Sequence, residues 1–197
     1  MNKLMGFYEL KEMRIPSVPW KEFREDTVLD DSILWTVRTS VFSGKDQDLP
    51  RKVGVTADEA VLFGKQMLAK FRGNGMVVYY PYFVADKSGT LMVSGGRTVI
   101  EAVKGDLWNM VTYGKTDVTV IVDGDDGNIR YAGDSGFLSA QEQDKILGCA
   151  PAVRHSFRDD LLEGREVLLE WSFARKSTVE KEPLGDPYLV FYEARTV

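Results

Sequence analysis

Apolar residues recur at helical spacing in two well-marked segments of the chain. The first, from Ala57 to Phe71, follows Thr56, and Glu59 stands three residues after that threonine. A threonine followed by a glutamate at this distance is the capping-box signature of a helix start. Ser139 opens the second segment, Ala140 to Leu147, with the same signature. Shorter helical stretches are predicted at Lys3–Met13, Trp20–Arg24 and Val153–Leu162.

Most of the other apolar residues stand in short runs rich in β-branched and aromatic side chains, which is typical of β-strands. Ser94 to Gly96 and Asp123 to Gly127 predict hairpin turns, whereas Ser43 to Gly54 and Arg175 to Pro187 are interpreted as polar loops. The predicted strands are Ile33–Thr39, Met76–Val84, Gly89–Val93, Arg97–Val103, Val118–Val122, Asn128–Ala132, Val167–Ala174 and Tyr188–Glu193.

Runs of antiparallel strands with segregated helices indicate the α+β class, with mostly antiparallel sheets and a few packed helices. We expect a single compact domain over residues 1–197. Two lobes, at about 1–75 and 76–197, are an alternative division of the same domain.

The composition narrows the range of functions. The chain has 30 acidic and 25 basic residues and a formal net charge of −5, which disfavours nucleic acid as a partner. One cysteine and one histidine are too few for a zinc site or an intrachain disulfide. No stretch approaches the roughly 20 apolar residues of a membrane span, and the first residues do not read as a signal peptide. We therefore expect a cytoplasmic protein that does not bind a membrane.

The last two predicted strands carry the most informative chemistry. Side chains alternate along a strand, so Leu168, Glu170 and Ser172 are predicted to share one face. By the same rule, the second strand presents a face made of Leu189, Phe191, Glu193 and Arg195. If the two strands pair, Glu170 and Glu193 come close together.

Two neighbouring carboxylates repel each other unless a cation lies between them. Mg²⁺ binds one or two carboxylates together with substrate phosphates, and Arg195 could hold a phosphate through a forked contact. An ordinary interpretation also stays open: Glu170 and Glu193 are solvated positions on an exposed sheet face, with Arg195 as a partner of one of them.

Several short motifs follow one another along nearly the whole chain. They are Lys3 with Glu9-Leu10, Ile15-Pro16 and Val18-Pro19; Val37-Arg38-Thr39-Ser40; Asp48-Leu49-Pro50; Met76 to Leu91 with Ser88-Gly89; Ile100-Glu101-Ala102-Val103; Glu170-Trp171; and Glu193-Ala194-Arg195. In this order they resemble the N-terminal nucleotide-binding domain of phosphoenolpyruvate synthase and pyruvate phosphate dikinase. These ATP-grasp enzymes transfer a phosphoryl group from ATP to a histidine on a separate domain.

The resemblance implies an ATP-grasp fold, with ATP and Mg²⁺ as cofactors. It also implies roles for single residues: Lys3 and Arg38 contact the ATP phosphates, Glu101 binds the adenosine, Glu170 and Glu193 hold Mg²⁺, and Arg195 braces the terminal phosphate. Arg38 and Arg195 are the implied catalytic residues, because positioned positive charge stabilises a phosphoryl group in transfer.

Each of these residues also has an alternative interpretation that involves no ligand. Lys3 would be an ordinary terminal lysine, Arg38 would form an ion pair on a strand, and Glu101 would be a solvated hairpin residue.

The chain also departs from the family pattern. Leu168 stands where the family has an aspartate, two residues before the metal-strand glutamate, and Asn109 replaces a second glutamate. The stretch that holds much of the phosphate lid in the family is shorter here, and Ser43-Gly44-Lys45 is its one remaining small-residue loop. The surroundings of His155 do not resemble a phosphohistidine motif.

These observations predict a magnesium–ATP-binding protein related to phosphoenolpyruvate synthase that acts as an ATP-dependent phosphotransferase or ligase. The phosphate acceptor would be a small molecule or a partner protein, and a homodimer is possible. Two alternatives remain open: a nucleotide-binding sensor or subunit of a split enzyme without catalysis, and a structural relative that has lost nucleotide binding.

Overall fold

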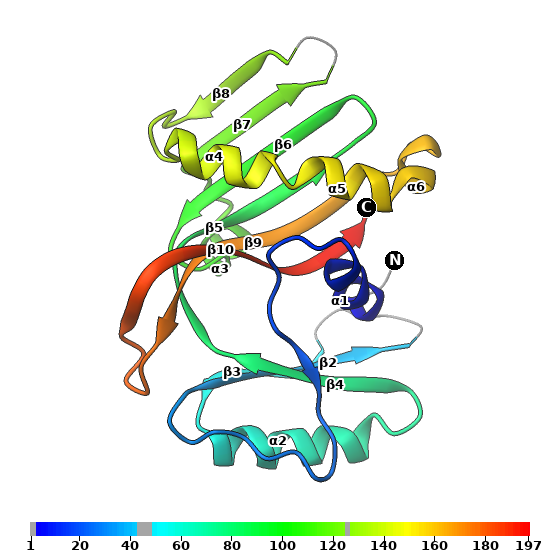
Figure 1. Cartoon of the computed structure of the whole chain (residues 1–197), viewed down its shortest axis with the longest axis vertical. Helices are drawn as coiled ribbons and strands as arrows, with labels where there is room; N and C mark the ends of the chain where they lie inside the picture. The colour runs from blue at the N-terminus through cyan, green and yellow to red at the C-terminus, as the bar shows by residue number, and fades with distance from the viewer. Residues whose placement is uncertain (1–2, 43–48, 125–126) are drawn as a thin grey trace. The chain divides into compact units, whose positions relative to one another are not determined.

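The computed structural model describes residues 3–42, 49–124 and 127–197 (Figure 1). The chain divides into two compact units, and neither is one continuous segment. The first unit comprises Met1–Phe7, Val18–Val84 and Arg175–Asp186, and the second comprises Tyr8–Ser17, Ala85–Ala174 and Pro187–Val197. Among the described residues, no helix is both long enough and apolar enough to span a membrane.

The first unit is built on an antiparallel sheet with strand order β1-β4-β2-β3. Its strands are β1 (Lys21–Glu22), β2 (Trp35–Val41), β3 (Arg51–Val55) and β4 (Gly75–Pro81). Helix α2 (Ala57–Lys70) packs on one face, where Phe23, Val37 and Val77 form a core with Ala60 of the helix (Figure 1). The capping box predicted from the sequence fixes the start of α2.

The second unit is built on a larger sheet with strand order β10-β9-β5-β6-β7-β8. Its strands are β5 (Phe83–Val93), β6 (Arg97–Lys104), β7 (Val118–Asp123), β8 (Ile129–Gly133), β9 (Val167–Ser177) and β10 (Pro183–Thr196). The five described helices besides α2 are α1 (Lys3–Glu12), α3 (Trp108–Tyr113), α4 (Ala140–Leu147), α5 (Ala150–Ser156) and α6 (Arg158–Leu162).

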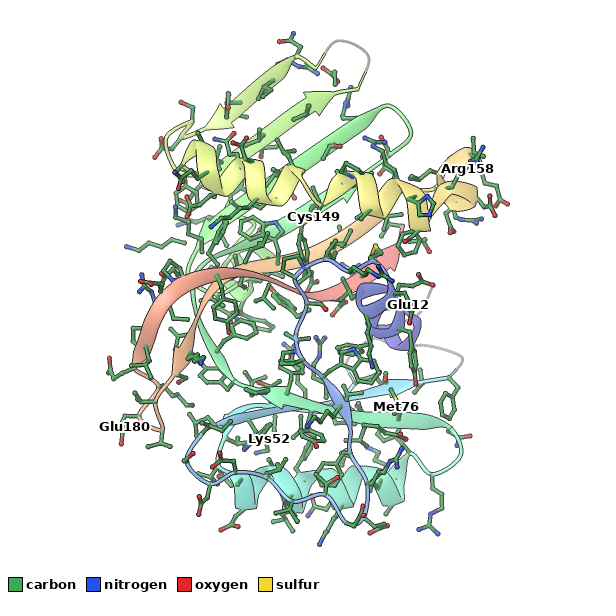
Figure 2. All side chains as sticks on the ribbon, in the orientation of Figure 1. Glu12, Lys52, Met76, Cys149, Arg158 and Glu180 are labelled. Carbon is green, nitrogen blue, oxygen red and sulfur yellow. The ribbon has the colours of Figure 1, made fainter. Side chains whose placement is uncertain are left out.

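One face of the larger sheet is apolar and buried. Leu91, Ile100 and Trp171 belong to a core that also includes Ile146 of α4 and Val153 of α5. Figure 1 shows these two helices lying across the sheet, and Figure 2 labels Cys149 at the point where they meet. Because side chains alternate along each strand, the residues between the core positions point to the opposite face. That opposite face carries the polar residues of the candidate site.

A half-buried ion pair joins this sheet to α4. Lys87 Nζ lies 2.7 Å from Glu142 Oε2 and also donates a hydrogen bond to the carbonyl oxygen of Phe137. The Glu142 carboxylate accepts a second hydrogen bond, from the backbone N–H of Ser139, in the capping box of α4. Burial alone would raise the pKa of Glu142, but the hydrogen bonds from Lys87 and Ser139 outweigh it and hold this pKa below its ordinary value of 4.5.

A carboxyl group with a lowered pKa stabilises the folded state above its unfolded pKa and loses that effect as the pH falls through its folded pKa. Replacing Glu142 with glutamine removes the charge and keeps a capping side chain. We expect Glu142→Gln to lower the free energy of unfolding by about 1 kcal/mol at neutral pH, and the difference from wild type to vanish in acid. Urea denaturation at a series of pH values measures both. A difference that stays constant down to about pH 3, below the ordinary pKa of a carboxyl group, would contradict the expectation.

The structure confirms the α+β class, both capping boxes and the hairpin at Ser94 to Gly96, where the N–H of Ser94 bonds to the carbonyl of Arg97. Three local predictions are wrong. The segment Trp20–Arg24 contains strand β1 instead of a helical turn, and the Ser43–Gly54 stretch contains strand β3. Exposed Arg51 and Lys52 hid β3, since an edge strand need not alternate apolar with polar residues.

The third correction concerns the Arg175–Pro187 stretch, predicted as a loop. Strand β9 continues to Ser177 and β10 begins at Pro183, so only a tight turn separates them. Thr178 and Lys181 close this turn by a backbone hydrogen bond, and Lys181 adopts a positive φ of 67°. Glu180 lies in this turn (Figure 2). The polar composition misled the prediction because the hairpin tip is exposed on both faces.

Candidate functional site

The polar face of the larger sheet carries hydroxyl and carboxylate groups on adjacent strands. Ser88 of β5 and Ser172 of β9 lie with their Oγ atoms 2.8 Å apart, and both are buried. Glu170 and Thr90 are two residues away from these serines and share their face. Thr90 faces Glu101 of β6 in the strand register. The sheet thus gathers polar groups from strands that are far apart in the sequence.

Three charged residues of this face lie on β9 and β10, the two strands at one edge of the sheet. Arg195 Nη2 lies 3.9 Å from Glu170 Oε1, and Arg195 Nη1 lies 3.6 Å from Glu193 Oε1. Both distances exceed hydrogen-bonding range, so these contacts are ion pairs. We call Glu170, Glu193 and Arg195 the charged cluster.

The two carboxylates of the cluster lie on neighbouring strands. Glu166 and Val197 exchange both backbone hydrogen bonds of an antiparallel pair. Continuing that ladder inward places Arg195 opposite Leu168 and Glu193 opposite Glu170. Side chains directly opposite each other in a sheet interact, and like charges there are destabilising. The side chain of Glu193 is only 5% exposed and that of Glu170 only 16% exposed, which makes their repulsion harder for water to screen.

The structure corrects one detail of the predicted face on β10. Leu189 and Phe191 belong to the apolar core together with Ala194, whereas Glu193 lies with Arg195 on the polar face. Strict alternation would have put Phe191 and Glu193 on one face. The strand is therefore irregular between these two residues, in the manner of a β-bulge. The irregularity allows Phe191 to fill the core while Glu193 lies beside Arg195 on the polar face.

Glu101, the predicted adenosine ligand, lies on the same face as the charged cluster. Thr90 donates a hydrogen bond from Oγ1 to Glu101 Oε2 over 3.3 Å. Thr90 is not among the site residues that the sequence predicts. The predicted hairpin held the signal, because counting outward from its turn pairs Val93 with Thr98 and hence Thr90 with Glu101.

The carboxylates of Glu170 and Glu193 are the candidate ligands for Mg²⁺. Among the residues that the structure describes, no group of three or more His, Cys, Asp or Glu side chains could hold a metal ion. Two carboxylates are enough for Mg²⁺ when phosphate oxygens and water complete its coordination. Glu170 and Glu193 therefore fit a metal that arrives with phosphate, and they do not form a cage for a metal alone.

The other two predicted cations belong to the first unit. Arg38 lies on β2 and is 8% exposed, with its Cζ atom 5.6 Å from the centre of the Phe7 ring. This position favours a cation–π interaction. Lys3 is the first residue of helix α1, and its side chain lies outside the described part of the structure. The predicted loop at Ser43-Gly44-Lys45 also lies outside the described residues.

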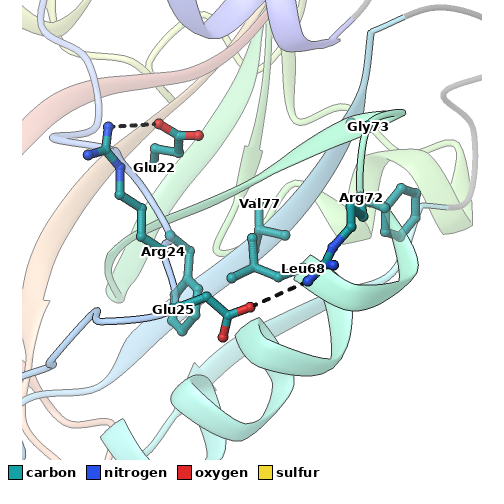
Figure 3. A pocket seen from close by; sticks show the side chains of 10 residues that line it. Glu22, Arg24, Glu25, Leu68, Arg72, Gly73 and Val77 are labelled. Atoms are coloured by element: carbon teal, nitrogen blue, oxygen red, sulfur yellow. Dashed lines mark hydrogen bonds and ion pairs between the residues drawn. The ribbon is translucent and has the colours of Figure 1, made fainter.

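A surface hollow of about 320 Å³ lies elsewhere in the first unit, at the carboxyl end of α2 (Figure 3). Its charged residues pair with one another: Arg24 Nη2 lies 3.2 Å from Glu22 Oε2, and Arg72 Nη2 lies 4.0 Å from Glu25 Oε1. None of the predicted site residues lines it. These exposed pairs contribute little energy and point to no ligand, so the charged cluster remains the candidate site.

Comparison with known proteins bears on the fold. No protein-family model and no curated protein sequence matches the chain. Solved structures do match. N5-carboxyaminoimidazole synthetase from Staphylococcus aureus, crystallised with ADP, has a TM-score of 0.50 and 12% identity, with 95% of this chain and 41% of that chain covered. D-alanine-D-alanine ligase from Helicobacter pylori has a TM-score of 0.50 and 11% identity, with 98% and 50% covered.

Both of these neighbours are ATP-grasp proteins, and the arrangement of antiparallel sheets with few helices agrees with theirs. The chain therefore has the ATP-grasp fold. It spans half or less of the length of these two structures. At such low identity the likeness concerns the fold, and the chemistry has to be argued from the residues of this chain.

Proposed function

We propose that this protein binds ATP together with Mg²⁺ and acts as an ATP-dependent phosphotransferase or ligase related to phosphoenolpyruvate synthase. The observation that carries the proposal is the charged cluster on the polar face of an ATP-grasp sheet. Two poorly exposed carboxylates beside a guanidinium are costly to bury without a ligand to bind. A metal–phosphate group would use all three of them.

Each side chain has a defined part in this proposal. Glu170 and Glu193 hold the metal, Arg195 braces the terminal phosphate, and Glu101, steadied by Thr90, binds the adenosine. Lys3 and Arg38 remain predicted phosphate contacts. Bound Mg²⁺ would offset the charge that develops on the transferred phosphoryl group. The contribution of the protein is then to position groups and supply fixed charge.

The proposal predicts metal-dependent nucleotide binding. In isothermal titration calorimetry, a non-hydrolysable ATP analogue should bind in the presence of Mg²⁺ and bind at least about tenfold more weakly after chelation with EDTA, because the carboxylates then repel the phosphates. Equal affinity with and without Mg²⁺ would remove the role of Glu170 and Glu193. Absence of binding at millimolar nucleotide would overturn the whole proposal.

A second candidate function is a nucleotide-binding module without catalysis. Leu168 favours it, because an apolar residue opposite Arg195 cannot help to hold a second metal ion. Assays of phosphate release and phosphoryl transfer, with pyruvate and other carboxylates as acceptors, distinguish the two. Analogue binding without turnover of ATP would support a sensor or a subunit that serves a partner protein. A homodimer stays a further prediction, to be tested by light scattering.

A further inference from the structure

The position of Arg195 has a consequence for the order in which ligands bind. Its guanidinium lies within 4 Å of both carboxylates of the charged cluster and contributes one positive charge to them. The like-charged pair of Glu170 and Glu193 is partly neutralised in this way before any ligand arrives. A free divalent cation would have to compete with that arginine for the same carboxylate oxygens.

The guanidinium itself is not fully engaged. Both of its ion pairs are longer than hydrogen bonds, and its Nε atom is buried without a hydrogen-bond partner among the described residues. The side chain as a whole is 40% exposed, so it can turn without leaving a buried cavity. A phosphate offers shorter, forked contacts to a guanidinium than these carboxylates do. Arg195 therefore has more to gain from a phosphate than from its present partners.

We propose that Arg195 makes the site selective for a metal that is already bound to a nucleotide. Free Mg²⁺ meets carboxylates that the arginine already compensates. The terminal phosphate of a metal–nucleotide complex attracts the guanidinium and so releases Glu170 and Glu193 to the metal. Metal binding then depends on phosphate binding. This inference rests on the proposed function and adds to it an order of binding: Arg195 opposes free metal, and the metal binds together with the phosphate.

The test compares binding of Mn²⁺, which electron paramagnetic resonance detects directly, in wild type and in Arg195→Gln. Wild type should bind Mn²⁺ alone weakly and bind it more tightly with the non-hydrolysable ATP analogue. Removing the competing charge should strengthen binding of Mn²⁺ alone about three- to tenfold and weaken binding of the analogue about tenfold, since a forked contact to phosphate is lost. The opposite signs are the signature of the exchange.

Two variants complete the experiment. Arg195→Lys keeps a cation near the carboxylates, so its binding of Mn²⁺ alone should stay as weak as in wild type. Arg158→Gln removes one exposed arginine from α6 and should change neither ligand (Figure 2 labels this residue). Thermal melts of all four proteins establish that each is folded. If Arg195→Gln binds Mn²⁺ alone no better than wild type, the inference is wrong.

Failure of the inference differs from failure of the proposed function. If the analogue does not bind wild type at all, the proposed function fails. The comparison of Mn²⁺ binding between wild type and Arg195→Gln still decides whether arginine and metal compete for Glu170 and Glu193. If the analogue binds with Mg²⁺ but wild type also binds Mn²⁺ tightly without it, the function stands and the dependence on phosphate is overturned.

Discussion

Replacing Gly89 with alanine is expected to lower the free energy of unfolding by about 3 kcal/mol or more, a large effect for one methyl group. A Cβ atom at this position would lie 1.9 Å from the backbone oxygen of Glu101 and 2.6 Å from Cζ2 of Trp171. The oxygen belongs to the paired strand β6 and cannot move alone, and the indole is completely buried. The sheet would have to open locally to accept the new group.

Gly96 supplies a matched control in the same hairpin. A Cβ atom added there meets no heavy atom within 4 Å, so Gly96→Ala should change stability by less than about 0.5 kcal/mol. Urea denaturation followed by tryptophan fluorescence measures both variants. If Gly89→Ala is as stable as Gly96→Ala, the close approach of β5, β6 and Trp171 is incorrect.

The same contact explains what two of the sequence motifs do. Ser88-Gly89 and Glu170-Trp171 lie far apart in the sequence, yet Ser88 contacts Ser172 and Gly89 lies against the Trp171 ring. Gly89 and Trp171 belong to the packing of the sheet, and Glu170 belongs to the candidate site. Part of the resemblance to phosphoenolpyruvate synthase thus marks the fold itself. This agrees with the comparisons, which show the ATP-grasp fold.

The sequence was sufficient to predict the features that a few consecutive residues determine, such as helix caps and short hairpin turns. Thr56 and Ser139 predict the starts of their helices because a capping box involves only four consecutive residues. The short turn after Ser94 fixes the register of β5 and β6, and with it the pairing of Thr90 with Glu101. Strand β3 was not predicted, because it is stabilised by pairing with β2 and its own residues show little of the pattern typical of a strand.

The pairing of Glu170 with Glu193 could be suspected from the sequence, but local patterns do not determine its register. Thr178 bonds to Glu182 at the turn between β9 and β10, and regular counting from there would set Glu166 opposite Ala194. The structure pairs Glu166 with Val197 instead. The register of the β9–β10 hairpin is therefore irregular, and no short sequence motif predicts this irregularity. The side-chain alternation used for the prediction fails along the same strand, between Phe191 and Glu193.

Changing Glu170 and Glu193 to glutamine is expected to have the largest effect on ligand binding. Each variant keeps the size of the side chain and removes one negative charge. With Mg²⁺ present, affinity for the non-hydrolysable ATP analogue should fall at least about tenfold for each, since loss of even an outer-shell partner of a metal ligand costs that much. After chelation the same variants should bind the analogue as well as wild type or better, because the carboxylates repel phosphate.

The sign of the effect in the presence of Mg²⁺ is what separates a metal site from an ordinary acidic patch. If Glu170 and Glu193 only pair with Arg195, removing them should release the arginine and strengthen nucleotide binding under both conditions. If they hold metal, the variants weaken binding only when Mg²⁺ is present. Glu166→Gln, one residue before β9, removes the same charge outside the cluster and should leave both titrations unchanged. Calorimetric titrations of all three variants, with Mg²⁺ and with EDTA, measure this difference. If the Glu170 and Glu193 variants bind the analogue more strongly than wild type in Mg²⁺, the two glutamates do not hold a metal and serve the fold alone.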